Sequence, residues 1–172
     1  MKVLVPLDGS SRSSSILPTA RRLVELVPDT EIHLVTVLNP ESVRGRLEHP
    51  VDSPRGGEAG TMIVEAPRPR TAETHGQALE RYEHEMREWL DDVSRSTFPT
   101  AERQCHVEWD DEPARAITRL ADRLGVDLIA MATHGRAGLS HLVVGSVTER
   151  VLRTARQPVL VAGPRIELQQ GG

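Results

Sequence analysis

Short apolar segments alternate along the chain with longer segments in which apolar residues recur at helical spacing. Five short segments have the length and composition of strands: 3–7, 31–37, 104–109, 126–132 and 158–162. Four amphipathic segments predict helices: 16–27, 71–95, 113–124 and 146–155. Because strands and helices alternate, the sequence predicts an α/β protein whose single parallel sheet is covered by helices on both faces.

Prolines and glycines set the expected boundaries of these elements. Pro6 has no amide hydrogen to donate to a neighbouring strand, so the first strand should end close to it. The serines in the run 10–15 are candidate N-caps for the first helix, and Pro18 must lie in its first turns or kink it. Gly125 stands where a glycine commonly follows the last turn of a helix.

The segment 40–70 differs in composition from the rest of the chain. It has four glycines, five prolines and many charges, with 62–64 as its one apolar cluster. It is too long for an ordinary connection and too polar for a core element. The sequence therefore predicts one domain over 1–165 with a flexible insertion at 40–70, followed by a frayed tail at 166–172.

Composition and charge exclude several classes of function. The 172 residues carry a formal net charge of −4 and no run of basic residues, so a nucleic-acid partner has no electrostatic support. The longest apolar runs are far too short to span a bilayer, and no signal-peptide pattern precedes the first strand. Cys105 is the single cysteine, so no internal disulfide can form. We expect a cytoplasmic protein without a membrane or nucleic-acid partner.

A glycine-punctuated loop at 132–148 carries the strongest functional signal. It joins the carboxyl end of a predicted strand to the amino end of a predicted helix, where parallel α/β proteins hold phosphate groups. Gly135 permits close approach of the backbone, and Gly145 leaves room for a phosphate beside the outward-pointing N–H groups of 145–147. Arg136 could add a guanidinium group to such a site, or it could simply be solvated.

The turn Asp8-Gly9-Ser10 is a second candidate, because it too follows the carboxyl end of a strand. The two loops would be neighbours if the first and fourth strands are adjacent in the sheet. Both candidates also have purely structural explanations. Asp8 could cap the turn that follows it, and Ser146 with Glu149 has the spacing of a capping box, which is compatible with phosphate binding.

With Val-Pro-Leu-Asp-Gly-Ser at 5–10, and with Ala-Thr-His-Gly, nine residues and Gly-Ser over 132–146, the sequence resembles the nucleotide-binding type of the universal stress protein family. Nucleotide-binding members carry Gly, two residues, Gly, nine residues, then Gly and Ser or Thr. The resemblance implies a Rossmann-like sheet of order 3-2-1-4-5, binding of an adenine nucleotide, and a homodimer joined through the last strand, 158–162. An exposed apolar edge at that strand independently favours pairing.

The resemblance also implies which residues bind the nucleotide. Asp8 would hold the ribose or adenine side with Pro6 beside it, and Val37 would meet the adenine through its main chain. The phosphates would be bound by Gly135, Gly145, Ser146, Val147 and Thr148. Ala132 departs from the pattern, because it stands where the first glycine of the motif is usual, and its methyl group would crowd or shift the ribose.

The chemistry around the loop favours binding over catalysis. Lys2 is the single lysine, so no phosphate-loop lysine is present, and no paired carboxylates stand beside the loop. His134 and His141 have no carboxylate or cysteine partners at metal-binding spacing, so we expect no protein-held metal, and Mg²⁺ only with the nucleotide phosphates.

We expect a dimeric regulatory protein of the stress response that binds ATP, or ADP or AMP, with no catalytic residues and at most weak ATP hydrolysis. One alternative is a slow ATPase or nucleotidyl-transfer enzyme in which Asp8 or His134 assists. Another alternative is a dimeric scaffold that has lost its nucleotide, for which Ala132 is the support in the sequence.

Overall fold

The computed structural model describes residues 1–41, 75–133 and 145–163 and contains a five-stranded sheet in which every pair of neighbours is parallel. Its strands are β1 Lys2–Pro6, β2 Glu31–Leu38, β3 Glu102–Trp109, β4 Leu128–Ala132 and β5 Val159–Ala162. They lie in the order β3-β2-β1-β4-β5. The predicted fold class and strand order are confirmed.

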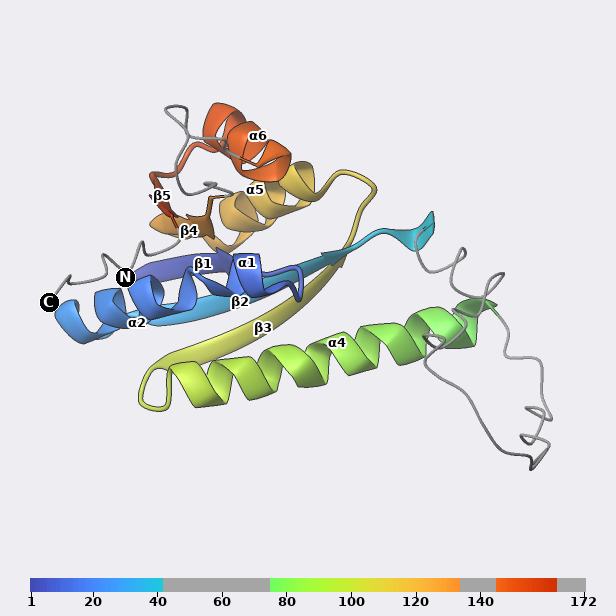
Figure 1. Ribbon diagram of the computed structural model, residues 1–172, viewed down its shortest axis with the longest axis horizontal. Coiled ribbons are helices and arrows are strands. Elements are labelled where there is room, and N and C mark those ends of the chain that lie inside the picture. Colours follow the sequence, from blue (N-terminus) through green and yellow to red (C-terminus); the bar gives the residue numbers. More distant parts are fainter. Residues whose placement is uncertain (42–74, 134–144, 164–172) are drawn as a thin grey trace, which may run out of the picture.

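Helices cover both faces of this sheet, as predicted (Figure 1). They are α1 Ser11–Ser14, α2 Leu17–Leu26, α4 His75–Thr97, α5 Pro113–Leu124 and α6 Ser146–Thr154. The helices α1, α2 and α4 lie on one face, and α5 and α6 lie on the other. No helix in the described part of the chain is long and apolar enough to cross a membrane.

The run 10–15, predicted only to supply N-caps for the first helix, contains a short helix of its own. The short helix α1 ends at Ser14 and α2 begins at Leu17, which puts Pro18 in the first turn of α2. A proline is tolerated there because its missing N–H would have no partner within the helix. Because Pro18 has no N–H to donate to the carbonyl of Ser14, α1 and α2 cannot form one continuously hydrogen-bonded helix.

The fourth strand begins two residues later than predicted. Gly125 takes a left-handed conformation at φ 60°, and the N–H of Val126 donates to the carbonyl of Ala121 at 3.1 Å. Val126 thus closes the end of α5 rather than opening β4. Of the predicted insertion the structure describes 40–41; residues 42–70 and the tail 166–172 lie outside the described residues.

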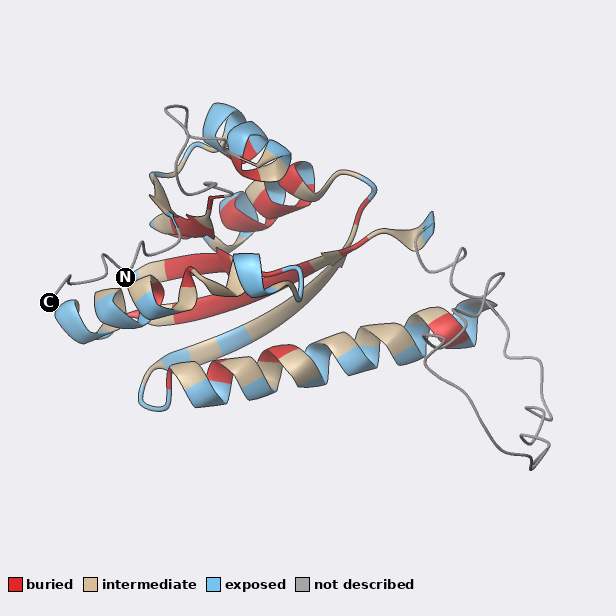
Figure 2. Cartoon of the chain, in the orientation of Figure 1, coloured by how far each residue is buried: buried red, intermediate tan, exposed pale blue. Residues whose placement is uncertain are grey.

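The hydrophobic core has one layer on each face of the sheet. Val3, Leu4 and Val5 in β1 are all fully buried, with Leu4 facing the opposite side from its two neighbours. The first core cluster joins the sheet to α2 and α4, and the second joins it to α5 and α6. Figure 2 shows the central strands as a continuous buried band, which is typical of a parallel sheet covered on both sides.

Two histidines meet across the β2–β3 pair. His33 is 1% exposed, and its Nδ1 lies 3.0 Å from Nε2 of His106, with the two rings stacked. This hydrogen bond needs one ring to donate and the other to accept, so at least one of them must be neutral. Burial lowers the pKa of both histidines. The nearby charge of Glu31 opposes this for His33, whereas His33 itself lowers the pKa of His106 further.

We predict that the free energy of unfolding decreases as the pH falls below the ordinary histidine pKa of 6.5. The folded chain holds both pKa values lower, so below 6.5 the unfolded chain binds more protons and is favoured; above 6.5 the stability is retained. Urea unfolding between about pH 7.5 and about pH 5.5 measures this.

The variant His106→Gln keeps a donor for His33 and removes one titrating ring, so its stability should depend less steeply on pH. His84→Gln, at an exposed position on α4, is the matched control. An unchanged pH dependence in His106→Gln would contradict the prediction.

Candidate functional site

A cavity of about 480 Å³ opens at the carboxyl ends of β1, β2 and β4, beside the first turns of α5 and α6. Its volume is in the range of ligand-binding pockets. Eight of the ten predicted site residues line it: Pro6, Asp8, Val37, Ala132, Gly145, Ser146, Val147 and Thr148. The other two, Gly135 and Arg136, lie outside the described residues, as do His134 and His141. We call this cavity the strand-end cavity.

The sheet topology explains why residues so distant in sequence meet here. β1 pairs with β2 on one side and with β4 on the other, so the turn after β1 lies beside the end of β4. The chain reverses its winding direction between β1 and β4, which is where such sheets bind ligands. The first and fourth strands are thus adjacent, and the turn after β1 and the start of α6 lie beside the same cavity, as predicted for adjacent strands.

Asp8 is fixed by a network of short hydrogen bonds at the mouth of the strand-end cavity. Its Oδ1 accepts from the N–H and hydroxyl of Ser10 at 2.9 and 2.6 Å, and its own N–H donates to Ser13 Oγ at 3.2 Å. Gly9 makes the turn possible with φ 80°. Burial would raise the pKa of Asp8, but the hydrogen bonds from Ser10 and Ser13 outweigh it and hold the pKa below its usual value.

The carboxylate is therefore ionised at neutral pH and oriented by its own turn. The structural explanation for Asp8 is thus observed, and it leaves the carboxylate group on the cavity wall, where it can accept hydrogen bonds from a ligand hydroxyl.

The amino end of α6 faces the cavity without a side-chain cap. Gly145 occupies the N-cap position with φ −58° and ψ 149°, and Ser146 is the first helical residue. The capping-box explanation for Ser146 is therefore wrong, because its hydroxyl comes one position too late to cap the helix. The N–H groups of the first turn have no partner within the helix and are available to an anion.

Thr148 and Ala132 connect the two ends of the predicted phosphate loop. The hydroxyl of Thr148, which is 3% exposed, donates to the carbonyl of Ala132 at 3.1 Å. The hydroxyl thus holds α6 to the end of β4, and Thr148 can offer a ligand its main-chain N–H. The methyl group of Ala132 packs against the first core cluster as well as lining the cavity.

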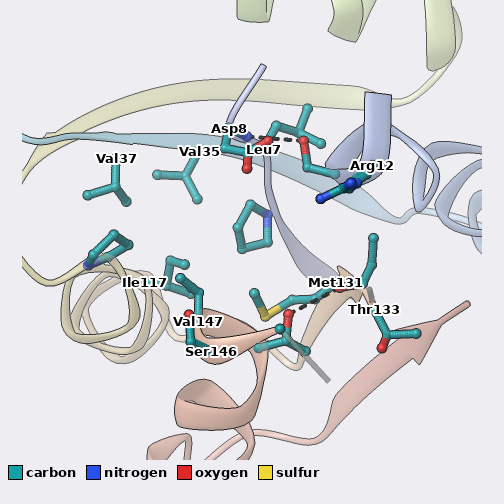
Figure 3. Close-up of a pocket in the computed structure, with 16 residues that line it drawn as sticks. Leu7, Asp8, Arg12, Val35, Val37, Ile117, Met131, Thr133, Ser146 and Val147 are labelled. Carbon is teal, nitrogen blue, oxygen red and sulfur yellow. Dashed lines mark hydrogen bonds between the residues drawn. The ribbon is translucent and has the colours of Figure 1, made fainter. Parts of the chain in front are cut away.

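The cavity also contains residues that the sequence did not single out. Val35 and Ile117 form an apolar wall near Val37, Met131 lies further along the cavity beside Thr133, and Arg12 lies toward the other end (Figure 3). Arg12 belongs to the serine-rich run, which predicted only helix caps. Ile117 was assigned to the core because its spacing on α5 cannot show that this helix begins next to the strand ends.

Comparison with known proteins identifies a family. The family model described as the universal stress protein family matches residues 1–163 of this chain. Universal stress protein MJ0531 of Methanocaldococcus jannaschii is 28% identical over 163 residues, which cover 93% of this chain and 80% of that protein.

Solved structures show the same fold. Protein MJ0577 of Methanocaldococcus jannaschii matches with a TM-score of 0.67 at 19% identity, over 95% of this chain and 96% of that one. A universal stress protein solved in complex with cAMP matches with a TM-score of 0.58 at 16% identity, over 96% of this chain and 98% of that one.

We predict that Thr148→Val lowers the free energy of unfolding by about 1–3 kcal/mol, because the Ala132 carbonyl loses its donor while the side-chain volume is kept. Urea unfolding measures the change. Thr154→Val, at an exposed position of the same helix, is the control and should stay within about 0.5 kcal/mol of the parent. Equal effects of the two substitutions would contradict the prediction.

Proposed function

This chain belongs to the universal stress protein family, and we propose that it binds an adenine nucleotide in the strand-end cavity and acts as a regulatory protein. One observation carries the proposal. Residues of the turn after β1 and of the start of α6, separated by more than a hundred positions, line the same cavity. A universal stress protein of the same fold has been solved with cAMP, itself an adenine nucleotide, which supports this ligand class.

The chemistry of the walls suggests how the nucleotide lies. The apolar wall of Val35, Val37 and Ile117 suits the flat base, and the ionised Asp8 can accept hydrogen bonds from ribose hydroxyls. The phosphates of ATP, ADP or AMP then lie at the amino end of α6, where unpaired N–H groups and the helix dipole favour negative charge. Mg²⁺ would arrive with the phosphates.

The same residues favour regulation over turnover. Among the described residues that line the cavity, Asp8 is the one carboxylate and no lysine occurs. Phosphoryl transfer depends on several charged groups placed around the reacting phosphate. We therefore propose that occupancy of the cavity acts as a signal in the stress response. We also assign the chain to the cytoplasm, where a single unpaired thiol such as Cys105 is usual.

We predict that MgATP binds the purified chain in isothermal titration calorimetry, and that Asp8→Ala weakens binding roughly ten- to a hundredfold through loss of hydrogen bonds to a charged group. Asp8→Asn keeps an acceptor for Ser10 and so isolates the effect of the charge. Asp92→Ala, on the exposed side of α4, is the control. No binding to the parent chain at millimolar MgATP would refute the proposed function.

We further propose that β5 joins two copies of the chain. β5 pairs with β4 along one edge, and no other strand in the described part of the chain pairs with its outer edge. Its four residues are apolar and only half-buried. An apolar edge of this kind is a template for pairing with another strand, and natural proteins seldom leave it open.

We predict a particle of twice the chain mass of 19.0 kDa by light scattering at micromolar concentration. Val161→Glu should give a monomer, because Val161 belongs to neither core cluster and its charge would oppose edge pairing. Leu26→Glu, which changes an exposed leucine of α2, should leave the dimer intact. A monomeric parent chain, or a dimeric Val161→Glu, would rule out this interface.

A further inference from the structure

Arg12 differs from the other arginines that the structure describes. Each of the others contacts an acidic side chain or a main-chain carbonyl. Within residues 1–41, 75–133 and 145–163, the side chain of Arg12 has no hydrogen bond or ion pair, although Asp8 also lines the cavity. A guanidinium carries five donors in a planar fork, so this residue retains its full binding capacity.

The backbone beneath Arg12 is held firmly in place. Ser10 caps α1 by accepting from the N–H of Ser13 at 3.1 Å. The N–H and the hydroxyl of Ser15 both donate to the carbonyl of Arg12, at 3.1 and 2.7 Å. α1 also contacts β4. The side chain is therefore projected from a fixed point toward the cavity (Figure 3).

The position of Arg12 in the cavity sets which part of a ligand it meets. Val37 belongs to β2, on one side of β1, whereas α1 contacts β4 on the other side. Figure 3 shows Val37 and Arg12 toward opposite ends of the cavity, with Asp8 and Ser146 on its walls between them. A nucleotide whose base lies at the β2 side therefore extends its phosphates toward Arg12.

The positive groups on the cavity wall favour an anionic ligand. Arg12 is the one cation among the described lining residues, and the amino end of α6, on the wall between Val37 and Arg12, adds the equivalent of about half a positive charge (Figure 3). Asp8 already accepts two hydrogen bonds from Ser10. A phosphate group between Arg12 and α6 would neutralise both positive elements and match the guanidinium fork with two oxygens.

We propose that Arg12 binds the outer phosphates of the nucleotide and makes the cavity selective for nucleoside di- and triphosphates over monophosphates. The inference rests on the proposed nucleotide-binding function. The N–H groups at the start of α6 can bind a phosphate of any of these nucleotides, whereas Arg12 binds only the phosphates that extend beyond the first one. Each such phosphate should therefore increase the affinity. ATP and ADP then bind more tightly than AMP, and AMP more tightly than adenosine.

The test compares MgATP, MgADP, AMP and adenosine by calorimetry on the full chain and its variants. Arg12→Gln should weaken MgATP binding roughly ten- to a hundredfold and leave adenosine binding unchanged. Arg12→Lys, which keeps the charge but loses the fork, should fall between the parent and Arg12→Gln. Arg21→Gln is the matched control, because Arg21 is exposed on α2, away from the cavity, and pairs with Glu25.

Thermal unfolding of Arg12→Gln should match the parent, because the side chain is exposed and forms no hydrogen bond or ion pair with the described residues that the substitution would break. An unchanged ratio of MgATP to AMP affinity in Arg12→Gln would overturn the assignment of Arg12 and leave the proposed function standing. If the parent chain binds none of the four ligands, the proposed nucleotide-binding function is overturned, and the role assigned to Arg12 is overturned with it.

Discussion

The structure depends on one constraint of parallel sheets: every strand must end at the same edge, so each connection has to travel back across a face before the next strand begins. β1 lies at the centre of this arrangement, paired on both sides and buried on both faces. Its apolar side chains are needed by both core clusters. The loops at the strand ends are thereby brought together at one edge of the sheet.

The cavity therefore combines two kinds of local structure. The turn after β1 is closed internally, because Asp8 and the serines around it satisfy one another. The start of α6 is open, because Gly145 supplies no capping side chain. One half is thus organised by its own hydrogen bonds, and the other has first-turn N–H groups without partners among the described residues. That contrast agrees with a rigid site that is completed by a ligand.

Much of this could be predicted from the sequence, because the signals for fold and cavity are strong and local. Alternating apolar segments predicted the parallel sheet, and the two loop motifs together with the family resemblance led to eight of the residues that line the cavity. The failures have specific physical causes. The spacing of Ser146 and Glu149 fits a capping box, yet the helix begins at Ser146, one residue earlier than that motif requires. The pairing of His33 with His106 depends on the β2–β3 register, which a sequence pattern does not show. Whether the side chain of Arg12 finds an acidic partner likewise depends on which residues the fold brings near it.

The uncapped start of α6 has a consequence for the balance between stability and responsiveness. Replacing a good N-cap residue by glycine costs only a few tenths of a kcal/mol, so the helix forms without a bound anion. Its first-turn donors nevertheless remain the weakest-satisfied part of the helix. An anion that binds there acts as the missing cap and ties the folding free energy of the whole chain to the concentration of that anion. Because Gly145 supplies no capping side chain, binding of an anionic ligand would increase the free energy of unfolding of the protein.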